Sequence, residues 1–363
     1  MKVLLITLLD KGGMVHYTSQ LANHLSELVK VTVIVPEECN PDYFNEKVNI
    51  RTVKTPSKGD GISRDQFNIF ELFKIINEIR PDIIHISGSY MWVIGLYFFL
   101  KVKKYPAIVT LHDINAHYGE DTFINKLTNY FYIKIAGHFF VHGKKLKQDL
   151  LKKKIDENKI SIIPHGDYSF FTRYSKSIDD DGSILFFGRI KDYKGLDYLL
   201  KAIPLIKEEI NDLNVIIAGR GNLDKYNNLI KDQSNIEIIN KYIEDDLVAE
   251  IFQRASIVVM PYIEGSQSGI IPIAYSFKKP VVVTDVGSIP EVVDDGITGF
   301  IVPPKDSKAL AKAIICILNN NSLREQMGKN SYKKMTEELS WDNISRKTIE
   351  IYKKISNDQY ASD

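Results

Sequence analysis

The sequence predicts an α/β protein made of two successive doubly wound parallel sheets. The chain has 363 residues, of which 44% are hydrophobic and 26% charged, and this length suffices for two domains of ordinary size. Short apolar runs alternate with amphipathic stretches along nearly the whole chain, a pattern typical of parallel strands covered by helices on both faces. The alternation is interrupted at Asp167–Ser183, where polar, charged and Gly residues predict a linker.

The first half of the chain supplies the first sheet, which we expect to form a domain over residues 1–168. Apolar runs predict strands at Val3–Leu8, Val31–Val35, Ile50–Val53, Ile83–Ile86, Ala107–Leu111, His138–Val141 and Ile160–Ile163. Amphipathic spacing predicts helices between several of these strands, at Val15–Leu28, Gln66–Ile79 and Lys144–Lys153.

The second half repeats the alternation and is expected to form a domain over residues 169–339. Its strands are predicted at Ile184–Phe187, Asn214–Ala218, Ile236–Ile239, Ile257–Pro261 and Pro280–Thr284, with helices that include Gly195–Glu209 and Lys308–Asn319. A last helix over residues 340–358 is expected to cross back onto the first unit through an apolar stripe of Trp341, Ile344, Ile349 and Tyr352. Because open parallel sheets bind ligands beyond the carboxyl ends of their strands, two facing units would form one cleft.

Composition argues against several classes of protein. The net charge of +1 is far from the strongly basic character of nucleic-acid-binding domains. The two cysteines, Cys39 and Cys316, lie too far apart in the sequence to build a disulfide framework or a zinc site, which favours a reducing, cytoplasmic compartment. The longest apolar run, Tyr90–Leu100, is shorter than the ~20 residues that a membrane-spanning helix needs.

The most informative stretch begins with the sequence FFGRIKDYKG. An apolar strand ends at Gly188, Arg189 follows it, and Lys194 stands just before a Gly that opens a helix. This order predicts a strand-to-helix crevice in which helix amides and two cations converge on an anion. A diphosphate suits such a site better than a single carboxylate does.

A second loop, EGSQSG, also lies between a strand and a helix. Its small polar residues can offer backbone N–H groups to a ligand, while Glu264 can accept hydrogen bonds from hydroxyls. A molecule that carries both a diphosphate and sugar hydroxyls is a nucleotide sugar. The sequence therefore predicts a nucleotide-sugar site made by Arg189, Lys194, Glu264, Gly265, Ser266, Gln267, Ser268, Gly269 and Ile270.

Six segments together resemble the retaining glycosyltransferases of the GT-B fold, specifically glycosyltransferase family 4. Each segment is weak alone, but their order and spacing extend over the chain. They are KGGMVHYTSQLANHLSE at 11–27, TLHD at 110–113, IIPHGD at 162–167, FGRIKDYKGLDYLLKA at 187–202, IIAGRGNL at 216–223 and the stretch from EGSQSG to FIVPP at 264–304. The resemblance implies two Rossmann-like domains that face each other across a cleft, the first for the acceptor and the second for the donor.

By this resemblance, four side chains serve catalysis. Arg189 and Lys194 would bind the donor diphosphate, which agrees with the reading from the residues themselves, since Arg offers a bidentate fork and Lys a point charge. Glu264 would contact the hydroxyls of the donor sugar, and His112 would point into the cleft near the transferred sugar. Each residue also has an ordinary alternative. Arg189 and Lys194 could be solvated charges at a helix start, Glu264 could be an exposed carboxylate in a turn, and His112 could be a hydrogen-bonded histidine of the core or its rim.

The resemblance also implies donor-side and acceptor-side residues. Gly219, Arg220 and Gly221 are similar to a family Gly-Asp-Gly, with Arg in place of the acid, and the backbone at Tyr242–Ile243 stands where the family reads the base. The expected donor-side residues outside the EGSQSG loop are Gly13, Gly188, Gly219, Arg220 and Ile243, and the acceptor-side residues are Gly12, His16, Asp113 and His165. Asp113 could equally cap a helix, and Gly12 with Gly13 could form a plain turn.

One departure from the family concerns a second glutamate that holds the nucleotide ribose. The matching position here is Pro272 or Ile273, depending on the alignment, so ribose recognition should differ. This departure motivates an alternative function, a GT-B nucleotide-sugar binder or epimerase without transferase activity. An oxidoreductase is a further alternative because Glu37 follows the second strand, but KGGMVHY lacks the G-x-G-x-x-G spacing of dinucleotide sites.

The resemblance implies a reaction and a set of partners. No residue stands out as a covalent nucleophile, which suits the family's front-face displacement with retention, and no carboxylate pair is spaced to hold a metal, so we expect no cofactor. The donor would be a UDP- or GDP-linked sugar, and the acceptor a glycan or lipid-linked hydroxyl in cell-surface polysaccharide or glycoconjugate synthesis. Lysines beside apolar residues in YFFLKVKKYP and GKKLKQDLLKKK predict contact with anionic lipid at the inner face of the membrane, unless they are the solvated ends of buried helices.

Overall fold

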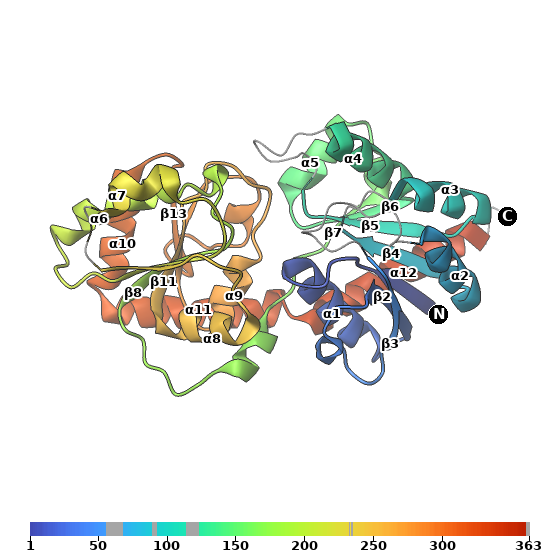
Figure 1. Cartoon of the computed structure of the whole chain (residues 1–363), viewed down its shortest axis with the longest axis horizontal. Helices are drawn as coiled ribbons and strands as arrows, with labels where there is room; N and C mark the ends of the chain where they lie inside the picture. Colours follow the sequence, from blue (N-terminus) through green and yellow to red (C-terminus); the bar gives the residue numbers. More distant parts are fainter. Residues whose placement is uncertain (56–67, 89–92, 114–122, 232, 234, 361–363) are drawn as a thin grey trace. The chain divides into compact units, whose positions relative to one another are not determined.

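The chain folds into two compact units, each with its own parallel sheet (Figure 1). The structure is a computed structural model that describes residues 1–55, 68–88, 93–113, 123–231, 233 and 235–360. The first unit comprises Met1–Gly166 and Trp341–Asp363, and the second comprises Asp167–Ser340. The prediction of two doubly wound α/β units is therefore confirmed.

The first unit is built on a seven-stranded sheet in the order β3-β2-β1-β4-β5-β6-β7, in which all neighbouring strands are parallel. The chain winds outward from β1 to β3 and then returns to β4 on the other side of β1, so the order reverses between β1 and β4. The strands are β1 Lys2–Ile6, β2 Lys30–Pro36, β3 Asn49–Val53, β4 Ile83–Ser87, β5 Ala107–Leu111, β6 His138–Val141 and β7 Ile160–Ile162.

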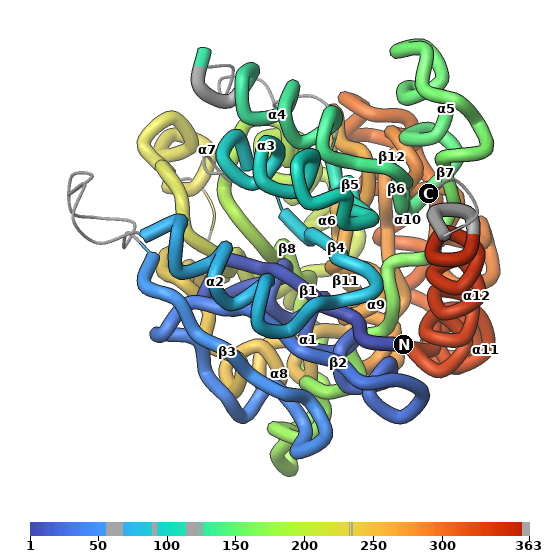
Figure 2. Tube along the Cα trace, turned by 90° about the vertical axis from the view of Figure 1, so that its right-hand side faces the viewer, coloured from blue at the N-terminus to red at the C-terminus, as the bar shows by residue number. Residues whose placement is uncertain are grey.

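Helices cover both faces of this sheet because successive strand residues point to opposite sides. Val3 and Leu5 pack under α1 and α12, whereas Leu4 and Ile6 pack under the helices α2 to α5. Neighbours α2, α3 and α4 lie side by side in both views of the chain (Figures 1 and 2). The helices are α1 Gly13–Leu25, α2 Ile69–Ile79, α3 Val93–Lys103, α4 Phe123–Ile135, α5 Lys144–Lys152 and α12 Trp341–Tyr360.

The C-terminal helix α12 belongs to the first unit although it follows the whole of the second. Its stripe of Trp341, Ile344, Ile349 and Tyr352 is buried in the same core as α1. Each fully buried large apolar side chain stabilises the fold by roughly 1.5–3 kcal/mol. The Tyr352 hydroxyl also bonds Nδ1 of His85 on β4, which ties the helix to the sheet.

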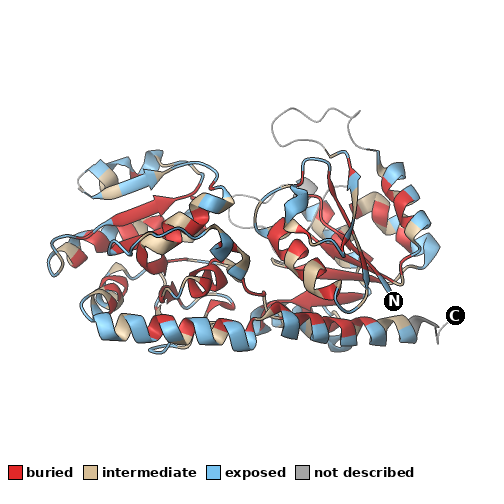
Figure 3. Cartoon of the chain, turned by 90° about the horizontal axis from the view of Figure 1, so that it is seen from below, coloured by how far each residue is buried: buried red, intermediate tan, exposed pale blue. Residues whose placement is uncertain are grey.

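The second unit holds a six-stranded parallel sheet in the order β10-β9-β8-β11-β12-β13. Helices α6 and α10 pack on one face, and α8, α9 and the end of α11 on the other. In both units the central strands are buried, whereas the edge strands β3 and β10 and the outer sides of the helices are partly or fully exposed (Figure 3). The elements are β8 Ser183–Phe187, β9 Val215–Ala218, β10 Ile236–Ile239, β11 Ala255–Met260, β12 Val281–Thr284, β13 Gly299–Val302, α6 Leu196–Lys207, α7 Asn227–Lys231, α8 Asp245–Arg254, α9 Ile270–Ser276, α10 Ser307–Leu318 and α11 Asn321–Glu338.

The segment predicted as a linker, Asp167–Ser183, is partly a packed element. Residues Ser169–Tyr174 form a 3₁₀ helix, and the side chains of Tyr168 and Phe171 are buried in the core of the second unit. The composition of the segment predicted a linker because its aromatic residues are scattered among polar ones. The segment is nevertheless packed, because its aromatic side chains are buried against α8 and α9.

Strand β13 was not predicted from the sequence. It has only four residues, begins with Gly299 and leaves Phe300 and Ile301 only partly buried.

The first residues of the helix expected at Gln66–Ile79 lie outside the described residues, as does part of the apolar run Tyr90–Leu100. Within the described residues, no helix has the combined length and apolar character that crossing a bilayer requires.

Candidate functional site

The loops that follow β8 and β9 touch at the point where the second sheet changes direction. Strand β8 has β9 on one side and β11 on the other, so its carboxyl end is the switch point of the sheet. The N–H of Gly188 donates to the carbonyl of Ala218 at 2.9 Å. An added Cβ on Gly219, whose φ is +143°, would lie 1.9 Å from the Gly188 oxygen. Gly219 is therefore required for this close approach of two loops.

Two tyrosines bring the predicted cations together. Nη2 of Arg189 donates a hydrogen bond to the Tyr193 hydroxyl at 3.2 Å. The ammonium group of Lys194 lies 3.7 Å from the ring centre of Tyr262 and 5.4 Å from that of Tyr193, within the range of cation–π attraction. Burial raises the pKa of the Tyr262 hydroxyl, so this group remains neutral beside the cations.

The loop from Glu264 to Ile270 adjoins these cations. The N–H of Ile263 donates to the carbonyl of Tyr193 at 2.8 Å. Gly195, with φ +67°, passes so close that an added Cβ would lie 1.9 Å from the Pro261 oxygen. The segment after β8 and the segment after β11 are thus packed directly on each other. The structure brings Arg189, Lys194 and the EGSQSG loop to one edge of the second sheet.

Other predicted donor-side residues contribute differently. Arg220 is exposed, and its carbonyl accepts a bond from the Ile190 N–H at 3.0 Å. The side chain of Ile243 is buried in the core, so only its backbone is available to a ligand. Pro272 and Ile273, where the family has its second glutamate, are both buried in α9. No carboxylate comes from either position.

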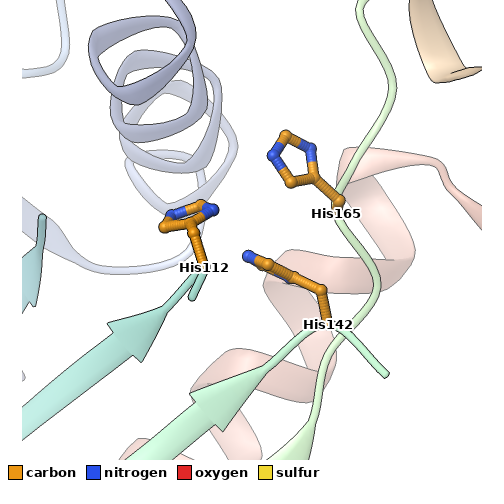
Figure 4. Close-up of side chains that lie close together, drawn as sticks. All are labelled: His112, His142 and His165. Atoms are coloured by element: carbon orange, nitrogen blue, oxygen red, sulfur yellow. The ribbon is translucent and has the colours of Figure 1, made fainter. Parts of the chain in front are cut away.

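In the first unit, three histidines meet at the carboxyl ends of neighbouring strands. His112 directly follows β5, His142 directly follows β6, and His165 comes shortly after β7. Their ring centres are 4.6 Å apart for His112 and His142, 4.8 Å for His142 and His165, and 5.5 Å for His112 and His165. Figure 4 shows the three imidazoles pointing toward one another. We call these three residues the histidine cluster.

The imidazoles of the histidine cluster are neutral at ordinary pH. Burial lowers the pKa of His142 to about 4. A hydrogen bond to the Ile163 carbonyl and the negative charge of Asp113 raise this pKa, but their effect is smaller. Burial and the neighbouring imidazole of His142 hold the pKa values of His112 and His165 well below their usual range. Neutral imidazoles can accept hydrogen bonds or bind metal ions through their lone pairs.

Helix α1 supplies an aromatic wall of the histidine cluster. The ring centre of Tyr17 lies 5.1 Å from that of His112 and 5.4 Å from those of His142 and His165. The preceding residue, His16, is buried and instead makes a T-shaped contact with Tyr43, with ring centres 5.1 Å apart. Of these two neighbours on α1, the structure thus brings Tyr17 rather than the predicted His16 to the histidines.

Two turns shape the same region. Gly12 has a φ of +86° and precedes α1, which begins at Gly13. Gly166 follows His165 with φ +24°, and an added Cβ there would lie 2.2 Å from the indole of Trp341. Asp113 is partly buried beside His112, and its alternative role as a helix cap concerns residues 114–122, which lie outside the described residues.

Sequence reasoning missed His142, Tyr193 and Tyr262. The signal for His142 was available, because it follows a predicted strand just as His112 does. The two tyrosines carry no such signal, since an aromatic residue near a strand end is usually part of the core.

Comparison with known proteins identifies two matching domains. Residues 11–166 match the family described as Glycosyltransferase Family 4, and residues 181–320 match the family described as Glycosyl transferases group 1. The chain is 26% identical to the glycosyltransferase MJ1607 of Methanocaldococcus jannaschii, with 86% of each chain covered. It is 23% identical to the phosphatidyl-myo-inositol mannosyltransferase of Mycolicibacterium smegmatis, covering 95% of this chain and 91% of that protein.

A solved structure has the same fold. Anabaena HepE in complex with UDP-glucose superposes with a TM-score of 0.76 at 14% sequence identity, over 98% of this chain and all of that one. At this identity the likeness bears on the fold alone.

Proposed function

The chain belongs to the glycosyltransferases of the GT-B fold, with a family 4 domain, and we propose that it transfers a sugar from a nucleoside-diphosphate sugar to a hydroxyl with retention of configuration. One observation carries this proposal: Arg189, Lys194 and the EGSQSG loop lie together at the switch point of the second sheet. Open α/β sheets bind nucleotides at such points.

The cations match the charge that develops during the reaction. As the bond to the sugar breaks, negative charge grows on the departing diphosphate. Arg189 and Lys194, already held by Tyr193 and Tyr262, can stabilise that charge without reorganising during the step. Glu264 would accept hydrogen bonds from the sugar hydroxyls, and the amides from Gly265 to Ile270 would contact sugar and phosphate.

Retention follows in this proposal from a front-face displacement. The acceptor hydroxyl attacks the anomeric carbon from the side on which the diphosphate leaves, and the hydroxyl proton passes to a departing phosphate oxygen. His112 would contact the transferred sugar as a neutral imidazole, while Gly12, His16, Asp113 and His165 would lie toward the acceptor. In this proposal no metal ion is needed at the diphosphate, since Arg189 and Lys194 would bind that group.

The donor is proposed to be UDP- or GDP-linked. The solved HepE structure holds UDP-glucose, which supports a uridine donor by analogy of fold. The backbone at Tyr242–Ile243 would read the base, while ribose recognition would differ from the family's because the second glutamate is missing. A hexosyl or N-acetylhexosaminyl group is the transferred unit that the family resemblance favours.

The proposed acceptor is a glycan or a lipid-linked hydroxyl used in cell-surface polysaccharide or glycoconjugate synthesis. A relative in Mycolicibacterium smegmatis is named for phosphatidyl-myo-inositol, which supports a lipid-linked acceptor. On α3, Phe98 and Val102 are 56% and 79% exposed beside Lys101 and Lys103, while Leu96 and Leu100 are buried. This exposed apolar and basic side supports peripheral contact with an anionic membrane at its cytoplasmic face.

Product analysis tests the proposal. The protein is incubated with a panel of nucleotide sugars, with and without candidate acceptors, and free nucleotide and product are measured. A transferase releases nucleotide and forms an α- or β-linked product with the donor's configuration only when acceptor is present. Conversion of the donor to an epimer, or binding without turnover, would instead support the nucleotide-sugar epimerase or binder that the missing glutamate suggests.

A further inference from the structure

The histidine cluster combines features that its proposed role in sugar transfer does not need. Three neutral imidazoles from three neighbouring strand ends converge on one point, and one nitrogen of each lies within 4.8 Å of the others. Contact with one transferred sugar requires a single imidazole. We propose that His112, His142 and His165 form a binding site for one divalent transition-metal ion of the Zn²⁺ class, with a fourth coordination position taken by water.

The positions of the rings already suit a shared ion. A tetrahedral ion about 2.0–2.1 Å from one nitrogen of each of three imidazoles holds the ring centres roughly 5 Å apart. The observed ring centres are separated by 4.6, 4.8 and 5.5 Å. The three nitrogens lie within 4.8 Å of one another, so rotation of the rings about their side-chain bonds would have to bring them closer to bind one ion.

His142 has the hydrogen bond that metal-binding histidines usually make. Its Nδ1 lies 2.9 Å from the carbonyl oxygen of Ile163, so the proton resides on Nδ1 and the lone pair on Nε2. In metal sites, the ring nitrogen away from the ion typically donates to a carbonyl or carboxylate in this way. Nε2 of His142 is buried and has no hydrogen-bond partner among the described residues. A bound ion would satisfy this atom.

The surroundings select the class of ion. The cluster contains only imidazole ligands, which suit Zn²⁺, Co²⁺, Ni²⁺ and Cu²⁺, whereas Mg²⁺ and Ca²⁺ prefer oxygen ligands. Tyr17 and Trp341, with ring centres 5.4 Å apart, form an aromatic wall beside the cluster. His112 and His165 are only partly buried, which leaves the ion a route from solvent.

Metal binding is measured directly, without an activity assay. Protein made without a polyhistidine tag is stripped with a chelator, dialysed against buffered Zn²⁺ and analysed for metal per chain. The same protein is titrated with Co²⁺, whose visible absorption reports tetrahedral nitrogen coordination. The expected result is one ion per chain. In His142→Ala and in His165→Gln the affinity should be lost or weakened by more than the ~10–100-fold that is typical of removing an outer-shell partner, because each variant removes a ligand.

The matched control is His24→Ala, which removes a histidine of α1 outside the cluster and should leave the affinity unchanged. Circular dichroism identifies any variant that fails to fold. If His142→Ala does not fold, the His165→Gln variant provides the test instead. The proposal is overturned if the unchanged protein takes up no stoichiometric Zn²⁺, or if a folded cluster variant binds Zn²⁺ and Co²⁺ as tightly as the control.

Discussion

The ammonium group of Lys194 lies 3.7 Å from the ring centre of Tyr262, although one residue follows β8 and the other follows β11. The contact forms because β8 and β11 are neighbours in the sheet and their carboxyl ends share an edge. Tyr193 links the two cations, because its hydroxyl accepts a hydrogen bond from Arg189 and its ring also lies near the ammonium group of Lys194. Two cations are thereby positioned before any diphosphate arrives.

Removing either cation should slow sugar transfer. A hydrogen bond to a charged group contributes about 1.5–3 kcal/mol, so Arg189→Ala and Lys194→Ala should each lower kcat/KM by roughly 10- to 150-fold. The measurement is initial-rate kinetics with the preferred donor. Lys201→Ala is the control, because Lys201 lies on α6 and pairs with Asp197 in solvent. Near-normal transfer by both site variants would contradict the proposed donor site.

Gly195→Ala should damage the donor site more than an equally strained glycine elsewhere does. The new methyl group would meet the Pro261 oxygen at 1.9 Å, forcing the segment after β8 away from the segment after β11. Gly182→Ala is the matched control, because φ is +82° there but nothing lies within 4 Å of an added Cβ. Backbone strain alone costs about 1–3 kcal/mol. Urea unfolding should show a larger loss for Gly195→Ala, together with weaker nucleotide binding; equal losses would argue against the packed loops.

Stability should fall as the pH drops below 6.5, in metal-free protein. Burial and the nearby His142 lower the pKa of His85 to about 3, so the unfolded chain binds a proton that the folded chain excludes. Stability is therefore complete above the unfolded pKa and decreases toward the folded pKa, by about 2 kcal/mol for one such histidine at pH 5. This window lies above the ordinary pKa values of carboxylates.

Unfolding free energies measured by urea at several pH values between 7 and 5 test this expectation. Histidines 112, 142 and 165 shift in the same direction and add to the slope. His85→Gln removes one titrating group, so the slope should become shallower by up to about 1.4 kcal/mol per pH unit. A slope that does not change in this variant would show that His85 titrates normally in the folded protein.

Chelation should not affect the rate of transfer, whereas added zinc should lower it. EDTA should leave the rate unchanged, because in the proposed site Arg189 and Lys194 rather than a metal ion would stabilise the diphosphate. Micromolar Zn²⁺ should inhibit transfer reversibly, since an ion in the proposed histidine site would compete with the transferred sugar for His112. Mg²⁺ at the same concentration is the control and should have no effect. Loss of activity in EDTA, restored by a metal, would instead mean that the reaction itself uses an ion.

Local features of the site were readable from the chain. Gly188, Arg189 and Lys194 stand at a strand-to-helix junction whose apolar run and glycines are visible in the sequence, and the structure places them there. The apolar stripe of α12 likewise identified a packed helix. Tyr168 and Phe171 were misjudged because their burial depends on distant helices rather than on neighbours in sequence.

The two α/β units, the strand ends that carry polar residues and the glycines needed at tight turns could thus be predicted from the order of residues alone. These properties depend on the periodicity of apolar residues and on backbone conformations within a few residues. In contrast, the contacts of Tyr193 and Tyr262 with the cations, and the meeting of His142 with His112 and His165, could be seen only in the folded units. Such meetings depend on which strands are neighbours in the sheet, and strand order arises from packing of the whole unit rather than from any local pattern.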